Sequence, residues 1–247
     1  MIRYLAAGAI LAAMGAAFYS QGHQEPSQLV ASYVTPLDGR SSAQRHNAEL
    51  CAKKLDGTLI PAGGEFSFNK TVGPWSRDQG FRRAPVSYGG QLIDAWGGGV
   101  CQTSTTLYNA ALLAGFRVVS RHPHTYAPGY VSPGRDAAVA YPNIDLRFVN
   151  RLPVAVVMHV RVVGDQLRAE LWAKTGQRAK VEVWQRPVES IEPRTIRLSP
   201  EPRTWVRNPG KTGHIVETWR SVDGVVERLS TDSYPVMDRV LDGASHR

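Results

Sequence analysis

The sequence has few of the residues and motifs that would mark several common functions. It contains only two cysteines, Cys51 and Cys101, in 247 residues. It lacks zinc-finger spacing, an aromatic-basic RNA-binding motif and a concentrated basic helix, which disfavours nucleic acid as a partner despite the net charge of +8. It has no GxSxG motif for a serine nucleophile, and its acidic residues are scattered, not paired as in glycosidases. The basic surface remains compatible with anionic lipid or an anionic wall polymer.

The N-terminus lacks an apolar run of the about 20 residues that a membrane span needs. Arg3 precedes a shorter apolar run from Tyr4 to Tyr19, and Gly15 and Ala17 near its end could occupy the small-residue positions before a cleavage site. Residues 1–20 therefore predict a signal peptide or an uncleaved anchor, with a membrane tether through residues 4–19 as the second case. The alternative is a buried Ala-rich helix. We expect an exported protein of the periplasm or cell envelope.

The two cysteines leave two interpretations open. In an oxidising compartment Cys51 and Cys101 could form one disulfide. A chain of this size does not need a disulfide to fold, which favours free thiols.

Composition and apolar spacing predict an α+β fold. A linker is expected at 21–39, a main domain at 40–186, a second linker in the proline-rich stretch 187–205 and a small β unit at 206–243. Within the main domain, a central helix with a cysteine at its N-terminus is expected to pack on an antiparallel sheet. The sheet is indicated by alternating segments joined at Gly164-Asp165 and Thr175-Gly176.

The stretch Gly97–Gly115, GGGVCQTSTTLYNAALLAG, predicts that central helix. Its apolar residues follow the spacing of one helix face, and Gly115 stands where the helix should stop. The candidate N-cap residues are Thr103, Ser104 and Thr105.

Cys101 is therefore expected within one turn of a helix N-terminus. Unpaired N–H groups and the helix dipole lower the pKa of a thiol placed there. The N–H groups from Gly99 to Gln102 could also hold an oxyanion. The alternative is a buried structural cysteine.

A thiolate needs a base, and His122 and His124 are the candidates. They flank Pro123 in an extended segment, so the sequence alone does not decide which imidazole faces the thiol, and each could instead be a surface residue. Asp136 is the preferred orienting group and Asp145 the next. Zinc bound by Cys101 and both histidines is a weaker alternative without recurrent ligand spacing.

Two arginines flank this segment. Arg121 and Arg135 could bind a substrate carboxylate, or they could be solvated surface charge.

The sequence resembles the VanW family, named for a gene of vancomycin-resistance clusters. The resemblance lies in four blocks that cover most of residues 40–160: PAGGEFSFNKTVGPWSRDQGFRRAP, GGGVCQTSTTLYNAALLAGF, RHPHTYAPGYVSPGRDAAVAY and DLRFVN. It implies a bacterial envelope protein and acyl transfer on peptidoglycan stem peptides through a cysteine thioester. By the resemblance Cys101 is the family's cysteine, His124, here followed by Thr125, is its histidine, and Asp136 matches its aspartate.

We therefore predict a secreted cysteine acyltransferase, similar to an L,D-transpeptidase, that needs no cofactor or metal. The alternatives are a non-catalytic wall-binding or scaffold protein, and a cysteine peptidase or amidase on the same polymer. The predicted catalytic residues are Cys101, His124 and Asp136, with His122 as the alternative base. The predicted substrate-binding residues are Gly98, Gly99, Gln102, Thr103, Ser104, Arg121 and Arg135.

Overall fold

The fold was obtained as a computed structural model that describes residues 28–88, 91–174, 179–199 and 204–243. The predicted signal peptide or anchor at 1–20 lies outside these ranges. Within them, no helix is both long enough and apolar enough to span a membrane.

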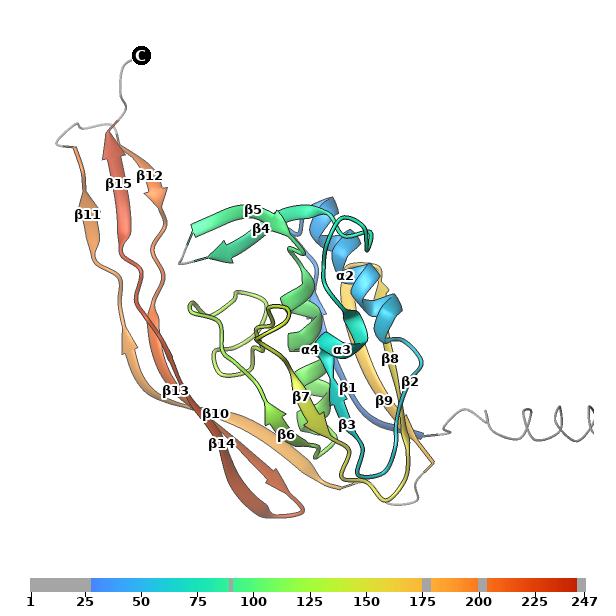
Figure 1. The fold of residues 1–247 in the computed structure, drawn as a ribbon. Coiled ribbons are helices and arrows are strands. Elements are labelled where there is room, and N and C mark those ends of the chain that lie inside the picture. The colour runs from blue at the N-terminus through green and yellow to red at the C-terminus, as the bar shows by residue number, and fades with distance from the viewer. Residues whose placement is uncertain (1–27, 89–90, 175–178, 200–203, 244–247) are drawn as a thin grey trace, which may run out of the picture.

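The main domain consists of two helices on a four-stranded antiparallel sheet (Figure 1). Helix α4 packs on strands β1 and β9, and helix α2 packs on β8 and against α4. The strand order is β1-β9-β8-β2. The bounds of these elements are β1 Gln28–Pro36, α2 Ser42–Leu55, β2 Thr58–Ile60, α4 Val100–Leu113, β8 Val156–Val163 and β9 Gln166–Ala173.

The local sequence accounts for both helices. Ser41 caps α2 in a reciprocal capping box with Gln44. Helix α4 is buried on nearly every side, including its threonines and Asn109, and is therefore the core helix of the domain. Gly115, with a φ of +74°, follows the helix as expected of a C-terminal glycine.

Smaller elements lie near the two ends of α4. A three-stranded sheet in the order β3-β7-β6 lies near the C-terminal end of the helix and directs the chain from β6 into the loops after residue 120, and the β4–β5 hairpin lies at the N-terminal end (Figure 1). The bounds are β3 Glu65–Ser67, α3 Phe68–Val72, β4 Arg83–Tyr88, β5 Gln91–Trp96, β6 Arg117–Ser120 and β7 Arg147–Val149.

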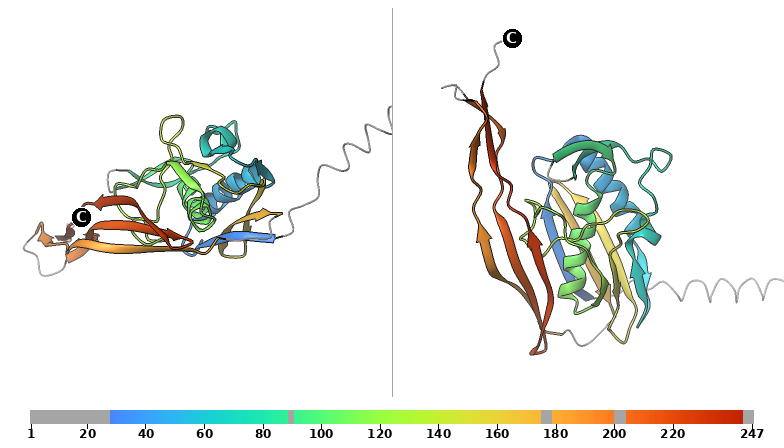
Figure 2. Two further views of the ribbon diagram at one scale, coloured as in Figure 1. Left: turned by 90° about the horizontal axis from the view of Figure 1, so that it is seen from below. Right: turned by 60° about the vertical axis from the view of Figure 1, so that its left-hand side comes forward.

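The C-terminal strands form an elongated unit along one side of the main domain (Figures 1 and 2). One sheet has the order β10-β13-β14 and the other the order β11-β15-β12. The buried Arg220 joins the unit to the core, because its guanidinium donates to Phe116 O at 2.7 Å, just beyond α4. The bounds are β10 Val181–Ile191, β11 Thr195–Arg197, β12 Thr204–Asn208, β13 Gly213–Val222, β14 Val225–Tyr234 and β15 Arg239–Gly243.

The α+β prediction is confirmed, with mostly antiparallel strands and few helices. The boundaries differ. Part of the expected linker 21–39 is strand β1, which pairs with β9 and buries Val30 and Ala31. The proline-rich stretch 187–205 contains the end of β10, all of β11 and the start of β12. Pro187 of β10 adjoins a register shift in the pairing with β13, a position at which strands tolerate proline. Strand β10 pairs with β13, so the C-terminal unit begins near residue 181, before the expected boundary at 186.

Candidate active site

Cys101 is the second residue of α4, whose N-cap is Gly99. Gly99 has a φ of +106°, and a Cβ there would lie 2.4 Å from Gln44 O of α2. Only glycine allows the two helices to approach this closely. The prediction that Thr103, Ser104 or Thr105 caps the helix is wrong, since all three lie inside the helix and are buried.

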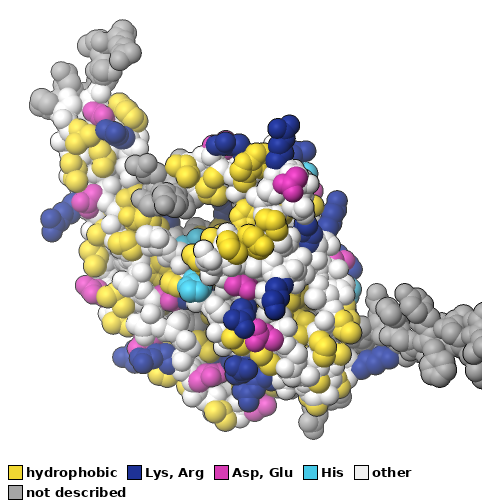
Figure 3. All heavy atoms as spheres, in the orientation of Figure 1, with side chains coloured by type: hydrophobic (Ala, Val, Ile, Leu, Met, Phe, Trp, Pro, Cys, Tyr) yellow, Lys and Arg dark blue, Asp and Glu magenta, His cyan; other side chains and the backbone are white. Residues whose placement is uncertain are grey.

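Both cysteines are free thiols, so the disulfide alternative is wrong. Cys101 is half-buried and lines a pocket of about 290 Å³. Its S–H group donates to Val139 O at 3.4 Å. The space-filling view shows the surface hollowed between the C-terminal strands and the main domain (Figure 3).

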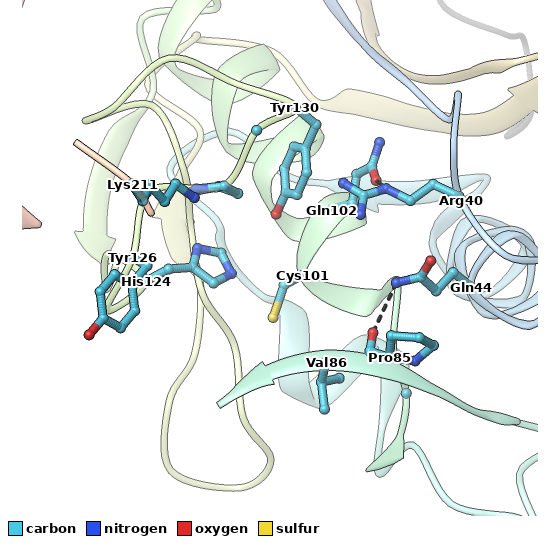
Figure 4. A pocket seen from close by; sticks show the side chains of 14 residues that line it. Arg40, Gln44, Pro85, Val86, Cys101, Gln102, His124, Tyr126, Tyr130 and Lys211 are labelled. Carbon is cyan, nitrogen blue, oxygen red and sulfur yellow. Dashed lines mark hydrogen bonds between the residues drawn. The ribbon is translucent and has the colours of Figure 1, made fainter. Parts of the chain in front are cut away.

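Of the two candidate bases, His124 lies in the Cys101 pocket. Its imidazole edge faces the sulfur side of the pocket (Figure 4). His122 is exposed, and its Nε2 lies 3.5 Å from Ser120 Oγ. The extended segment thus directs alternate side chains to opposite sides. The zinc alternative fails for the same reason, and in the described part of the chain no group of three or more His, Cys, Asp or Glu side chains could hold a metal ion.

Asp136 orients His124. The His124 Nδ1–H donates to Asp136 Oδ2 at 2.7 Å, and the His124 backbone N–H donates to the same oxygen at 2.7 Å. This leaves Nε2 available to the Cys101 sulfur. Asp145, the second choice, lies elsewhere: it accepts from Ser67 Oγ at 2.6 Å and from Asn69 N at 2.9 Å, at the start of α3.

The electrostatics favour a thiolate–imidazolium pair. Burial raises the pKa of the Cys101 thiol. The hydrogen bond and the charge of His124 act in the opposite direction and outweigh burial, so that the pKa lies below its ordinary value. Burial lowers the pKa of His124, but its bonds to Asp136 and Cys101 raise it to about 9. Burial raises the pKa of Asp136, while the hydrogen bond from His124 and the charge of Arg121 hold it below its usual range.

The fully buried Asp136 is fixed by residues from both parts of the chain. Arg121 Nη2 donates to Asp136 Oδ1 at 3.0 Å, and Tyr234 of β14 donates to the same oxygen at 2.5 Å. Arg121 Nη1 also binds Asp232 of β14 at 2.5 Å. Burial raises the pKa of Tyr234, which keeps its hydroxyl protonated as a donor. The C-terminal unit therefore completes the surroundings of the Cys101–His124–Asp136 group.

Neither predicted carboxylate-binding arginine reaches the pocket. The Arg121 side chain is 5% exposed and is neutralised by two aspartates. Arg135 is buried, donates from Nε to Asn109 Oδ1 and lies over the Tyr33 ring. The interpretation of both as substrate-binding residues is wrong, because their guanidinium groups hold the protein together.

Of the other predicted substrate-binding residues, which lie at or just before the start of α4, only some line the pocket. Gly99 and Gln102 line the pocket, whereas Gly98, Thr103 and Ser104 do not. The Ser104 hydroxyl donates to Ala137 O at 2.6 Å, Thr103 is buried, and a Cβ on Gly98 would lie 2.7 Å from Pro85 O. These three residues therefore have structural roles.

The backbone at the start of α4 restricts the candidate oxyanion donors. The Val100 N–H donates to Gly97 O at 3.0 Å, and the Gln102 N–H donates to Gly99 O at 3.2 Å. The Cys101 N–H has no acceptor among the described residues. Because helix N-termini leave such groups unpaired, the amide of Cys101 itself is the best placed donor.

Several further pocket residues escaped sequence reasoning, among them Arg40, Tyr126, Tyr130 and Lys211. Arg40 follows β1, the two tyrosines lie in the loop after β6, and Lys211 precedes β13. No local pattern around Arg40 marks it as a pocket residue, since only the packing of β1 beside α4 brings it there.

Known proteins resemble this chain over its main domain. The profile of the VanW-like protein family matches residues 43–172. The chain belongs to the VanW family. In Bacillus subtilis (strain 168), the protein YoaR is 35% identical over 147 residues, which cover 60% of this chain and 48% of YoaR. The vancomycin B-type resistance protein VanW of Enterococcus faecalis (strain ATCC 700802 / V583) is 27% identical over 133 residues, 51% of this chain and 48% of that protein. The chain thus matches about half the length of these curated relatives.

Two solved structures match a smaller part of this chain. The G5 domain of IgA1 protease is 18% identical, with a TM-score of 0.19, and the match covers 29% of this chain and 98% of that domain. HP0197-G5 is 19% identical, with a TM-score of 0.18, covering 27% and 95%. The VanW match ends at residue 172. Lys211 therefore lines the pocket from outside the matched region, and Asp232 and Tyr234 bind Arg121 and Asp136 from outside it.

Proposed function

We propose that this VanW-family chain is a cysteine acyltransferase of the cell envelope that acts on peptidoglycan stem peptides. One observation carries the proposal: His124, hydrogen-bonded to the buried Asp136, lines the same pocket as the half-buried Cys101 at the N-terminus of α4. A nucleophile, a base and an orienting group in this order are the parts that acyl transfer requires. The family resemblance supports stem peptides as the substrate. The signal peptide or anchor expected at residues 1–20 supports the envelope as the compartment.

The first half-reaction forms a thioester. The Cys101 thiolate attacks the carbonyl carbon of a stem-peptide amide, and the carbonyl oxygen takes up negative charge opposite the Cys101 N–H. The carbon–nitrogen bond then breaks. His124, already protonated at neutral pH, gives its Nε2 proton to the leaving amine. The products are an acyl-thioester and a free amine.

The second half-reaction regenerates the thiolate. An amine of a second stem attacks the thioester carbonyl while His124 takes up one of its protons. The carbon–sulfur bond breaks, and the new amide leaves with Cys101 again as thiolate and His124 as imidazolium. Water in place of the amine would give hydrolysis, as in a cysteine peptidase or amidase.

The test compares two cysteine variants of the purified protein on muropeptides. Cys101→Ala should lower product formation by at least about 1,000-fold, as removal of a nucleophile does. Cys51→Ala is the matched control, since it also removes one thiol but from the core, and it should retain activity. Unchanged product formation by Cys101→Ala would reject the proposal.

The products distinguish the alternatives. Cross-linked or amine-exchanged muropeptides support transfer, and trimmed monomers alone support a peptidase or amidase. The non-catalytic alternative predicts a buried or disulfide-bonded Cys101; the free, half-buried thiol disfavours it.

A further inference from the structure

The Cys101 pocket contains two cations that lack an acidic partner. Arg40 and Lys211 both line it, and within the described ranges neither forms a salt bridge with a carboxylate. By contrast, the nearby Arg121 forms two salt bridges, one with Asp136 and one with Asp232. An arginine at a protein surface needs no partner, but one held in place beside a nucleophile is available to a ligand.

Arg40 is held in place by buried neighbours. Its Nε donates to Gln102 Oε1 at 2.8 Å. The Gln102 side chain is itself fixed, because its Nε2 donates to Pro36 O at 2.6 Å and to Thr35 Oγ1 at 3.1 Å. The guanidinium carbon lies 4.9 Å from the centre of the Tyr130 ring. These contacts fix the plane of the guanidinium and leave its two terminal NH₂ groups without protein acceptors among the described residues.

Lys211 is less suited to bind an anion. Its ammonium donates to Ala127 O, and burial lowers its pKa. Arg40 and Lys211 lie on opposite sides of Cys101, with Tyr130 between them (Figure 4). The planar fork of an arginine binds a carboxylate with two parallel hydrogen bonds, which a lysine cannot do.

We propose that Arg40 binds the terminal carboxylate of the acyl donor, so that the enzyme accepts peptides that end at the residue it removes. This inference rests on the proposed function. In a peptide whose main-chain carbonyls are amides, the main-chain carboxylate nearest to a scissile bond is that of a terminal leaving residue. A cation fixed in the same pocket as the nucleophile selects for that carboxylate and against an amidated or extended chain.

The test uses one donor in two forms, L-alanyl-γ-D-glutamyl-L-lysyl-D-alanine and its C-terminal amide. Its lysine side chain carries no carboxylate, so the two forms differ only at the terminal residue. The wild type should prefer the acid over the amide by about 100-fold in kcat/KM, the size expected for a charge-assisted bidentate pair. In Arg40→Met the preference should fall to about 3-fold or less, because the acid loses affinity while the amide is unaffected.

Three further variants sharpen the result. Arg40→Lys should restore part of the preference, since it retains the charge without the fork. Arg83→Met should leave it unchanged, because Arg83 is an exposed strand residue paired with Asp94 outside the pocket. Lys211→Met should also retain most of it. A preference that survives Arg40→Met, or that disappears in Lys211→Met instead, overturns the assignment.

Binding to the Cys101→Ala protein separates this inference from the proposed function. Calorimetry with the same two peptides needs no turnover. If the acid binds more tightly in an Arg40-dependent manner but the wild type forms no product, the carboxylate site stands and the acyltransferase proposal fails. If the wild type converts acid and amide at equal rates, the acyltransferase stands and the role of Arg40 fails.

Discussion

Cys51 and Cys101 lie on helices α2 and α4, which pack against each other, but their surroundings differ in nearly every respect. Cys51 is in the middle of its helix and fully buried, and burial raises the pKa of its thiol. Cys101 is in the first turn of its helix, where an imidazole and an open pocket reach the sulfur. Burial affects both thiols; what separates them is the partner that stabilises the thiolate.

Alkylation of the native protein should show the largest effect. Iodoacetamide at neutral pH should modify Cys101 at least about 1,000-fold faster than Cys51, since a buried and protonated thiol is inert. Mass spectrometry of proteolytic peptides measures both rates in one sample. In denaturant the two rates should converge, and similar rates in the native protein would remove the distinction between the two regions.

Replacing the imidazole should make Cys101 behave more like Cys51. With His124→Asn, only burial acts strongly on the thiol pKa, so the midpoint of the pH–alkylation curve should move upward from its lowered value. The acyl-transfer rate should fall by about 100- to 10,000-fold, the range for loss of a general acid–base. In the wild type the rate should also decline above about pH 9, where His124 loses its proton.

His122→Asn is the matched control, because it makes the same change two residues away on an exposed side chain. It should leave both the pH–alkylation curve and the transfer rate unchanged. An equal effect of the two substitutions would contradict the assignment of His124.

A smaller effect is expected from Tyr234→Phe, which removes one hydrogen bond to Asp136 from the C-terminal unit. The transfer rate should fall by about 10-fold, within the range for one hydrogen bond to a charged group. The pH midpoints of the profile should move with it, which a general loss of stability would not cause. The neighbouring Ser233 is exposed, so Ser233→Ala should have no effect.

The sequence could predict features that depend on neighbouring residues in the chain, but not those that depend on contacts between distant segments. Cys101 was recognisable because glycines, cysteine and helix are adjacent in the chain, and the resemblance identified His124 and Asp136. The sequence did not show which side of the extended segment faces the pocket. Only the three-dimensional structure shows that this side carries His124 and not His122.

The errors concern charge pairing. Arg121 and Arg135 were adjacent to the site in sequence, but their guanidinium groups are satisfied by Asp232 and Asn109 in the fold. Arg40 directly follows the segment 21–39, which was expected to be a linker. That segment contains strand β1, which pairs with a segment more than 100 residues later. No local pattern reports such long-range pairing.

The bond from Tyr234 to Asp136 also bears on how this protein can be divided for experiments. A fragment cut near residue 173 would keep the whole region matched by the VanW profile, yet Asp136 would lose a neutral donor and Arg121 one of its two counter-ions. Such a truncated fragment would be a poor substitute for the longer chain in tests of the proposed activity. Exchanging the last strands between relatives, by contrast, would be a direct way to tune the basicity of the imidazole from a distance.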